Sequence, residues 1–278
     1  MASPCRFSKP ISQTSLEGTE FAVDEAADII FEGHIPAARP EAAHDVLGTW
    51  KVVSDEREMS RLPRNAGELA TLLKSRHAQI MEGRPDKGPG RFKADPNRAG
   101  STLFVAPELV EGTLAKGFEI YRGLASPLHR AIFMMFLVSE VHPFADGNGR
   151  IARTMMNAEL VAAGENWIIV PTVYRDNYLM ALKALSQNRI TGALVRTMDF
   201  AQRYSRHRFR GTGPGALYPG PASCVHRFDR GRRGWHPFDV AHARNSQRRN
   251  AALEVAIAMT EWLSAPGRRG YFSPQRAG

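Results

Sequence analysis

The sequence predicts a mostly α-helical protein with one small β-hairpin and a basic C-terminal extension. Through most of the first 205 residues, apolar side chains recur at the spacing of helices that bury one face. The one run rich in β-branched and aromatic residues, 101–105, is short and follows a loop, which suggests a hairpin rather than a sheet. From residue 206 the composition shifts to Gly, Pro and Arg without regular apolar spacing.

The helical segments follow from this spacing one by one. The segment 12–31 alternates apolar residues with acids, and 127–141 is apolar almost all round, as expected of a buried central helix. The loop 84–101 is rich in Gly, Pro and charge. In chain order the expected helices are 12–31, 43–59, 66–81, 127–141, 151–164, 174–188, 193–207 and 251–264. We therefore expect an N-terminal helical region (1–64), a central domain (65–205) and an Arg-rich, disordered tail (206–278).

Composition excludes several classes of protein. The chain has 278 residues and a net charge of +9, all of it from the tail, where thirteen Arg face four acidic residues. It contains no run of about 18 apolar residues that would span a membrane, and its start has no apolar core typical of a secretory signal. Its two cysteines, Cys5 and Cys224, are far apart and form no zinc-type spacing. These features indicate a cytoplasmic protein without disulfide scaffold or structural zinc.

The residues that indicate most about function are clustered between 142 and 153. They are His142, Phe144, Asp146, Gly147, Asn148, Gly149, Arg150 and Arg153. A helix that begins near Asn148 leaves its first backbone N–H groups without partners, and these attract anions. Arg150 and Arg153 lie three residues apart and share a helix face, which suits a polyphosphate.

Two further residues of this cluster suggest phosphate chemistry. Asp146 supplies a hard oxygen ligand for a phosphate-bound Mg²⁺, and the imidazole of His142 is able to take a proton from an attacking hydroxyl. The usual phosphate-binding loop, GxxxxGK[ST], does not occur in the sequence.

The stretch HPFADGNGRIAR (142–153) resembles the signature of the Fic family, HxFx[D/E]GNGRxxR, at every fixed position. The resemblance extends over roughly residues 12–205. It implies the helical Fic (Fido) fold and an adenylyltransferase, which uses ATP and Mg²⁺ to transfer AMP to a hydroxyl of a target protein.

The resemblance also implies a role for each residue of the motif. His142 would be the general base, and Asp146 would hold Mg²⁺ between the α- and β-phosphates. The backbone amides of residues 147–149 would form the anion hole. Arg150 would contact the β-phosphate and Arg153 the γ-phosphate, while the Phe of the motif would anchor the loop in the core.

The N-terminal segment 11–26 resembles the inhibitory helix of class II Fic proteins, which carries the motif [S/T]xxxE[G/N]. Glu17 and Gly18 fit this motif, whereas Gln13 stands where Ser or Thr is expected. The resemblance implies that Glu17 pairs with Arg153 and withdraws it from the γ-phosphate. The alternative is an ordinary glutamate on a helix surface.

The segment 89–107 occupies the position of the family's flap, a hairpin that docks the target peptide as an added strand. Lys93, Ser101, Thr102 and Phe104 are the residues expected to line it. The alternative is a surface hairpin without a partner.

The segment 171–188 resembles the helix of the family that faces the adenine. Tyr174 and Tyr178 are four residues apart on one helix face, and Tyr178 is the better candidate for the base. The family often has an Asn about eight residues further on, where this chain has Ser186. The alternative is that both tyrosines only pack against neighbours.

The target is expected to be a protein with an acceptor Tyr, Thr or Ser, and self-modification is a further option. Rival hypotheses keep the fold but use UTP or CDP-choline as the donor, or run the reaction in reverse to remove AMP. Another is a non-catalytic scaffold that binds nucleic acid through the basic tail. For the tail, a charged disordered extension is the favoured interpretation.

Overall fold

The computed structural model describes residues 21–100, 102–170, 174–208 and 246–264, which form a mostly helical molecule with one antiparallel hairpin, as expected. The longer helices are α3 (Pro40–Ser54), α5 (Ala66–Ile80), α6 (Val110–Arg122), α7 (Pro127–Val141), α8 (Asn148–Ala162), α9 (Arg175–Asn188), α10 (Thr191–Arg208) and α12 (Ser246–Ser264). The short elements are α2 (Val23–Ala27), α4 (Glu56–Met59), a π-helical turn (Asp28–Glu32), two 3₁₀ turns (Pro85–Lys87 and Pro107–Leu109), and strands β1 (Arg98–Ala99) and β2 (Thr102–Leu103).

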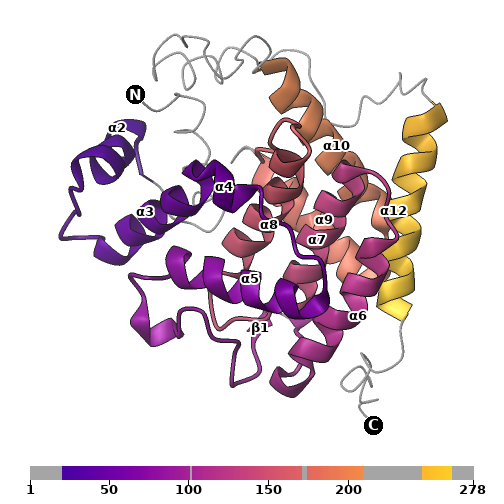
Figure 1. Cartoon of the computed structure of the whole chain (residues 1–278), viewed down its shortest axis with the longest axis horizontal. Helices are drawn as coiled ribbons and strands as arrows, with labels where there is room; N and C mark the ends of the chain where they lie inside the picture. Colours follow the sequence, from indigo (N-terminus) through magenta and orange to yellow (C-terminus); the bar gives the residue numbers. More distant parts are fainter. Residues whose placement is uncertain (1–20, 101, 171–173, 209–245, 265–278) are drawn as a thin grey trace.

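Helix α7 lies at the centre of the molecule, with α6, α8 and α12 packed against it (Figure 1). Residues 131–138 are all buried, so the helix has no solvent face over two turns. An all-round apolar sequence is stable only in such a position. The predicted helix 127–141 is therefore confirmed, and its C-terminal end leads directly into the motif 142–153.

The N-terminal helices form a flank with a small apolar cluster of their own. Phe21, Ile29 and Val46 belong to this cluster, and α3 then packs on α5. The predicted helix 43–59 is broken in the structure, because the Asp55 side chain accepts hydrogen bonds from the backbone N–H groups of Arg57 and Glu58 (2.9 and 3.1 Å). This cap starts α4 as a separate turn.

Of the predicted helix 12–31, only the part from residue 21 lies in the described region. There the chain forms α2 and continues as the π-helical turn, which ends at Gly33. Gly33 has a φ of 69°, the left-handed conformation in which glycine commonly ends helices.

The predicted strand 101–105 is realised as a minimal hairpin. Strand β2 pairs with β1 in antiparallel register, Arg98 opposite Leu103 and Ala99 opposite Thr102. The Gln187 side chain donates a hydrogen bond to Thr102 Oγ1 (3.2 Å). This contact ties the hairpin to the C-terminal end of α9.

Helix α6 was not predicted from the sequence. Its buried residues Val110, Leu114, Phe118 and Tyr121 have the spacing of one helix face, so the signal was present. Gly117 lies on the same face, where an added Cβ would overlap the side chain of Leu137 on α7. The glycine therefore lets α6 approach the central helix closely.

The expectation of a disordered tail is wrong for the segment that forms α12, because this helix packs on the body of the protein. Residues 209–245 and 265–278 of the tail lie outside the described residues. Val255, Met259 and Trp262 are buried at helical spacing, and the Trp262 ring meets Phe136 of α7 edge-on at 5.4 Å. The tail as a whole is Arg-rich, but the face of α12 that carries these residues is apolar. The helix predicted at 251–264 is therefore present, as part of α12. Among the described residues, no helix has the length and apolar character needed to cross a membrane.

Candidate active site

The turn between α7 and α8 determines the shape of the site. His142 follows the last residue of α7 with a φ of 51°, and Gly147 precedes α8 with a φ of 73°. A Cβ on Gly147 would lie 2.7 Å from Met81 Sδ. Both its backbone conformation and the available space therefore require glycine at position 147.

His142 is held in one orientation by two contacts. Its Nδ1 lies 3.1 Å from the backbone oxygen of Ser139. Because a carbonyl oxygen only accepts hydrogen bonds, Nδ1 carries the proton and Nε2 holds the lone pair. The Phe104 ring, from the chain that follows β2, stacks on the imidazole with centroids 3.7 Å apart and an interplanar angle of 5°. The arrangement gives His142 the tautomer that a general base needs at Nε2.

The loop after His142 is fixed by side-chain amides. Asn148 accepts from the Phe144 backbone N–H (2.9 Å) and donates to the Phe144 carbonyl (2.8 Å). Asn97 donates to the same carbonyl (2.9 Å). These three bonds satisfy the backbone of a buried turn, which would be costly to leave unpaired.

Lys93 was expected to line the hairpin, but the structure places it elsewhere. It lies beneath the loop, where its backbone N–H donates to the Pro143 carbonyl (2.9 Å) and its ammonium lies 2.6 Å from Asn97 Oδ1. Burial lowers the pKa of Lys93 to about 8. The ammonium also lies 3.4 Å from the carbonyl of Val141, at the end of α7 where the helix dipole favours a positive charge.

His77 of α5 supports the loop from the other side. Its Nδ1 accepts a hydrogen bond from the Gly90 N–H (3.0 Å), so Nε2 carries the proton and donates to the Asp146 carbonyl (3.0 Å). The imidazole stacks on the Phe144 ring with centroids 3.7 Å apart. Burial lowers the pKa of His77 to about 4, which keeps the ring neutral.

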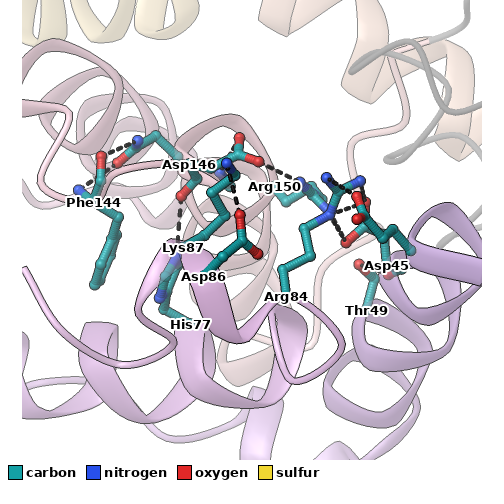
Figure 2. Close-up of polar contacts among 12 residues, drawn as sticks. Asp45, Thr49, His77, Arg84, Asp86, Lys87, Phe144, Asp146 and Arg150 are labelled. Carbon is teal, nitrogen blue, oxygen red and sulfur yellow. Dashed lines mark hydrogen bonds and ion pairs between the residues drawn. The ribbon is translucent and has the colours of Figure 1, made fainter. Parts of the chain in front are cut away.

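Arg150 belongs to an ionic network that reaches α3, as Figure 2 shows. Its Nη1 lies 2.6 Å from Asp45 Oδ1, and its Nη2 lies 3.8 Å from Asp146 Oδ2. Arg84 binds the same Asp45 carboxylate through Nε and Nη2 (2.6–3.1 Å). The Asp45 carboxylate is 1% exposed and lies between two guanidinium groups. The pKa of Arg84 is raised, chiefly by its hydrogen bond to Asp45.

A cavity of about 450 Å³ opens beside His142, within the range of small-molecule sites, roughly 300–1,000 Å³. Its walls come from four parts of the chain. They are the end of α7 (Ser139, Glu140, His142), the loop and first turns of α8 (Asp146, Asn148, Gly149, Arg153), one face of α9 (Arg175, Tyr178, Leu179, Leu182, Lys183, Ser186) and the hairpin region (Ala99, Gly100, Thr102, Phe104).

Charge is distributed unevenly around this cavity. The N-terminal end of α8 and the side chain of Arg153 make one end attractive to an anion. Arg175 and Lys183 add positive charge along α9. Glu140 supplies a buried carboxylate, whose Oε2 accepts a hydrogen bond from Ser186 Oγ (3.1 Å).

The structure brings most of the predicted site residues together around this one cavity. They are Thr102, Phe104, His142, Asp146, Asn148, Gly149, Arg153 and Tyr178. Arg150, expected at a β-phosphate, is directed instead toward Asp45. Tyr178 is 2% exposed, and its hydroxyl lies 3.5 Å from Met135 Sδ. Glu17 and Ser101 lie outside the described residues.

Sequence reasoning missed the residues that hold the site from outside the motif. Asp45, His77, Arg84 and Asn97 come from four separate places along the chain, and nothing in their local sequence marks them. Glu140 did have a signal, because it is the one acidic residue of the mostly apolar segment 127–141.

Comparison with known proteins defines the class first. Residues 69–160 match the profile of the Fic/DOC family. The chain is 30% identical over 99 residues to a Fido domain-containing protein of Dictyostelium discoideum, a match that covers 34% of this chain and 69% of that protein. The chain therefore belongs to the Fic/DOC family.

Two further comparisons extend this result. The chain is 36% identical over 64 residues to the protein adenylyltransferase Fic of Drosophila persimilis, which covers 23% of this chain and only 13% of that protein. A crystal structure of a Fic domain containing signaling protein from Bacteroides thetaiotaomicron has the same fold, with a TM-score of 0.56 and 17% identity, over 77% of this chain and 90% of that one. The predicted Fic fold is thus confirmed.

Proposed function

We propose that the chain is a protein adenylyltransferase, which moves AMP from ATP to a hydroxyl side chain of a target protein. The observation that carries this proposal is the position of His142. It lines the same cavity as the first turn of α8 and holds its proton on Nδ1. A base and an anion site therefore flank one space large enough for a nucleotide.

The proposed reaction is a displacement at the α-phosphorus. The acceptor oxygen forms a bond to this atom, its proton passes to Nε2 of His142, and the bond to the pyrophosphate oxygen breaks. Negative charge then grows on the leaving pyrophosphate. The N–H groups of residues 148 and 149 and the guanidinium of Arg153, all at the cavity wall, would stabilise that charge.

Asp146 fits the part of a Mg²⁺ ligand. Its carboxylate is partly exposed at the cavity wall, and one oxygen accepts from the Gly147 N–H (2.7 Å). Mg²⁺ is commonly held by one or two carboxylates together with phosphates and water. Within the described residues, no group of three or more His, Cys, Asp or Glu could hold a metal, so a Mg²⁺ at Asp146 would take its other ligands from the nucleotide and water. The ion would neutralise phosphate charge.

We further propose that Glu17 inhibits the enzyme by binding Arg153. A carboxylate competes directly with phosphate for a guanidinium group. Arg153 is buried at the cavity wall, so a carboxylate that reaches it would block the anion end of the cavity. The target would present a Tyr, Thr or Ser hydroxyl, and the chain itself is the first candidate.

The test is the intact mass of the Glu17→Gly protein after incubation with Mg²⁺ and ATP, UTP or CDP-choline. The proposal predicts a gain of one or more adenylyl units with ATP, well above the wild-type level. Glu20→Gly, a change to the same residue type in the same segment, is expected to behave like the wild type. A gain with UTP or CDP-choline alone would reassign the donor, and no gain with any donor would contradict transfer to the chain itself, leaving a separate target protein to be tried.

A further inference from the structure

Glu140 places a carboxylate at the wall of a cavity whose anion-binding end is formed by the start of α8 and Arg153. The side chain comes from the last turn of α7, two residues before His142, and the residue is 8% exposed. A buried carboxylate near a bound polyphosphate is unfavourable unless its oxygens accept hydrogen bonds. Glu140 already accepts a hydrogen bond from Ser186, and an ionised carboxylate has acceptor sites for further donors, so this part of the wall suits a ligand group that donates hydrogen bonds.

The contacts of Glu140 connect it to the end of α9, which in turn bonds to the hairpin. Ser186 Oγ, which donates to Glu140 Oε2, is in the last turn of α9. The next residue, Gln187, bonds to Thr102 of the hairpin. Glu140 therefore lies where the ends of α7 and α9 meet the hairpin, whereas the phosphate-binding amides are at the start of α8.

A nucleotide with its phosphates at α8 would place its base against this other part of the cavity. The α9 face there offers Leu179 and Leu182, which suit the flat, apolar surface of a base. The hairpin region also lines the cavity, with Phe104 and Thr102 at the wall. This placement rests on the proposed function.

We infer that Glu140, oriented by Ser186, determines which base is accepted by binding an exocyclic amino group. An ionised carboxylate accepts hydrogen bonds and donates none. Adenine, cytosine and guanine each carry an amino group, whereas uracil presents carbonyl oxygens in its place. A carbonyl facing Glu140 would leave two acceptors against each other in a buried site. ATP and cytidine donors are therefore compatible with Glu140, and UTP is disfavoured.

The expected discrimination follows from the strength of the bond. A hydrogen bond to a charged group contributes about 1.5–3 kcal/mol, which corresponds to about a 10- to 100-fold change in affinity. Removing the amino group from the ligand and removing the carboxylate from the protein eliminate the same bond. The two changes together should then cost little more than either alone, the signature of a direct interaction.

The experiment measures binding of Mg²⁺ complexes of ATP, of purine riboside triphosphate, which lacks the 6-amino group, and of UTP. The full-length Glu17→Gly protein is compared with the same protein carrying Glu140→Met or Glu140→Gln. We expect ATP to bind about 10- to 100-fold more tightly than the other two when Glu140 is present. With Glu140→Met the preference should fall to within about threefold. With Glu140→Gln, UTP should gain affinity, because the amide also donates.

Controls separate this inference from the proposed function. Glu165→Gln replaces a carboxylate that bonds to Gln202, away from the cavity, and should keep the preference for ATP. If the parent protein bound ATP and purine riboside triphosphate with equal affinity, the inference about Glu140 would be overturned, while the proposed function would still stand. The inference would also be overturned if the preference for ATP survived Glu140→Met. The same holds if Glu140→Met removed a difference in affinity between ATP and 2′-deoxy-ATP, because the carboxylate would then contact the ribose. If no nucleotide binds any variant, the proposed function fails and this inference fails with it.

Discussion

At the scale of single residues, the two histidines of the site depend on contacts made by distant parts of the chain. The Ser139 carbonyl decides which nitrogen of His142 carries the proton, and Phe104 covers one face of the ring. His77 is fixed in a similar way between the Gly90 N–H and the Asp146 carbonyl. In both cases a hydrogen bond on one ring nitrogen defines the chemistry of the other.

The low pKa of His77 predicts a specific pH dependence of stability. The unfolded chain takes up a proton at this residue below pH 6.5, whereas the folded protein does so only near pH 4. The contribution of neutral His77 to the free energy of unfolding is therefore complete above pH 6.5. This contribution, ~3 kcal/mol, is lost as the pH falls toward 4. Urea unfolding at pH 7 and pH 4.5 measures it. His77→Gln should be less stable at pH 7 and show a shallower loss on acidification, and a loss as steep as in the wild type would contradict this account.

At the scale of elements, α3 is connected to α8 by a buried ion network rather than by apolar packing alone. Asp45 is the shared partner of Arg84 and Arg150, so a substitution of Asp45 removes an ion pair from both guanidinium groups at once. A buried ion pair adds little net stability when intact, but breaking it leaves uncompensated charge. The N-terminal flank is thereby linked to the motif itself.

Replacing Asp45 tests this link. Asp45→Asn should lower the free energy of unfolding by about 3–5 kcal/mol, because the buried Arg150 loses its nearest counter-charge and the half-buried Arg84 keeps only the exposed Glu41. Glu41→Gln is the matched control, since Glu41 bonds to the same Arg84 but its side chain is 65% exposed. That change should cost less than about 1 kcal/mol. Equal effects of the two substitutions in urea unfolding would show that the network is not buried as described.

The docking of α12 gives a second prediction at this scale. Trp262→Ala removes a fully buried ring that touches Phe136, and should cost about 3–5 kcal/mol. Glu261→Ala, an exposed neighbour on the same helix, should leave the melting temperature nearly unchanged. A Trp262→Ala protein that melts like the wild type would mean that α12 does not pack on the core.

The same elements show how far local sequence predicts this fold. The segment 127–141 was predictable because a helix apolar on all sides has only one stable position, the interior. The break at Asp55 was missed because the apolar spacing continues across it, and only the cap marks the new start. Helix α6 was missed although its apolar spacing is regular, and α12 shows that a charged region can contain one buried face.

At the scale of the whole molecule, the central pair α7 and α8 lies between two flanks, the N-terminal helices on one side and α12 on the other (Figure 1). The motif 142–153 was predictable as a site because its residues are contiguous in sequence. Its supporting residues were not, because Asp45, His77 and Asn97 reach it only through packing of separate helices and loops. No local pattern contains that information.

The central claim is that one cavity binds the nucleotide while His142 accepts the proton of the acceptor hydroxyl. The most direct measurement compares Glu17→Gly with Glu17→Gly/His142→Ala for both Mg²⁺–ATP binding and adenylyl transfer. The account predicts affinities within about threefold of each other and a loss of transfer of roughly 100-fold or more. Transfer that persists without His142, or nucleotide binding that disappears with it, would contradict the account.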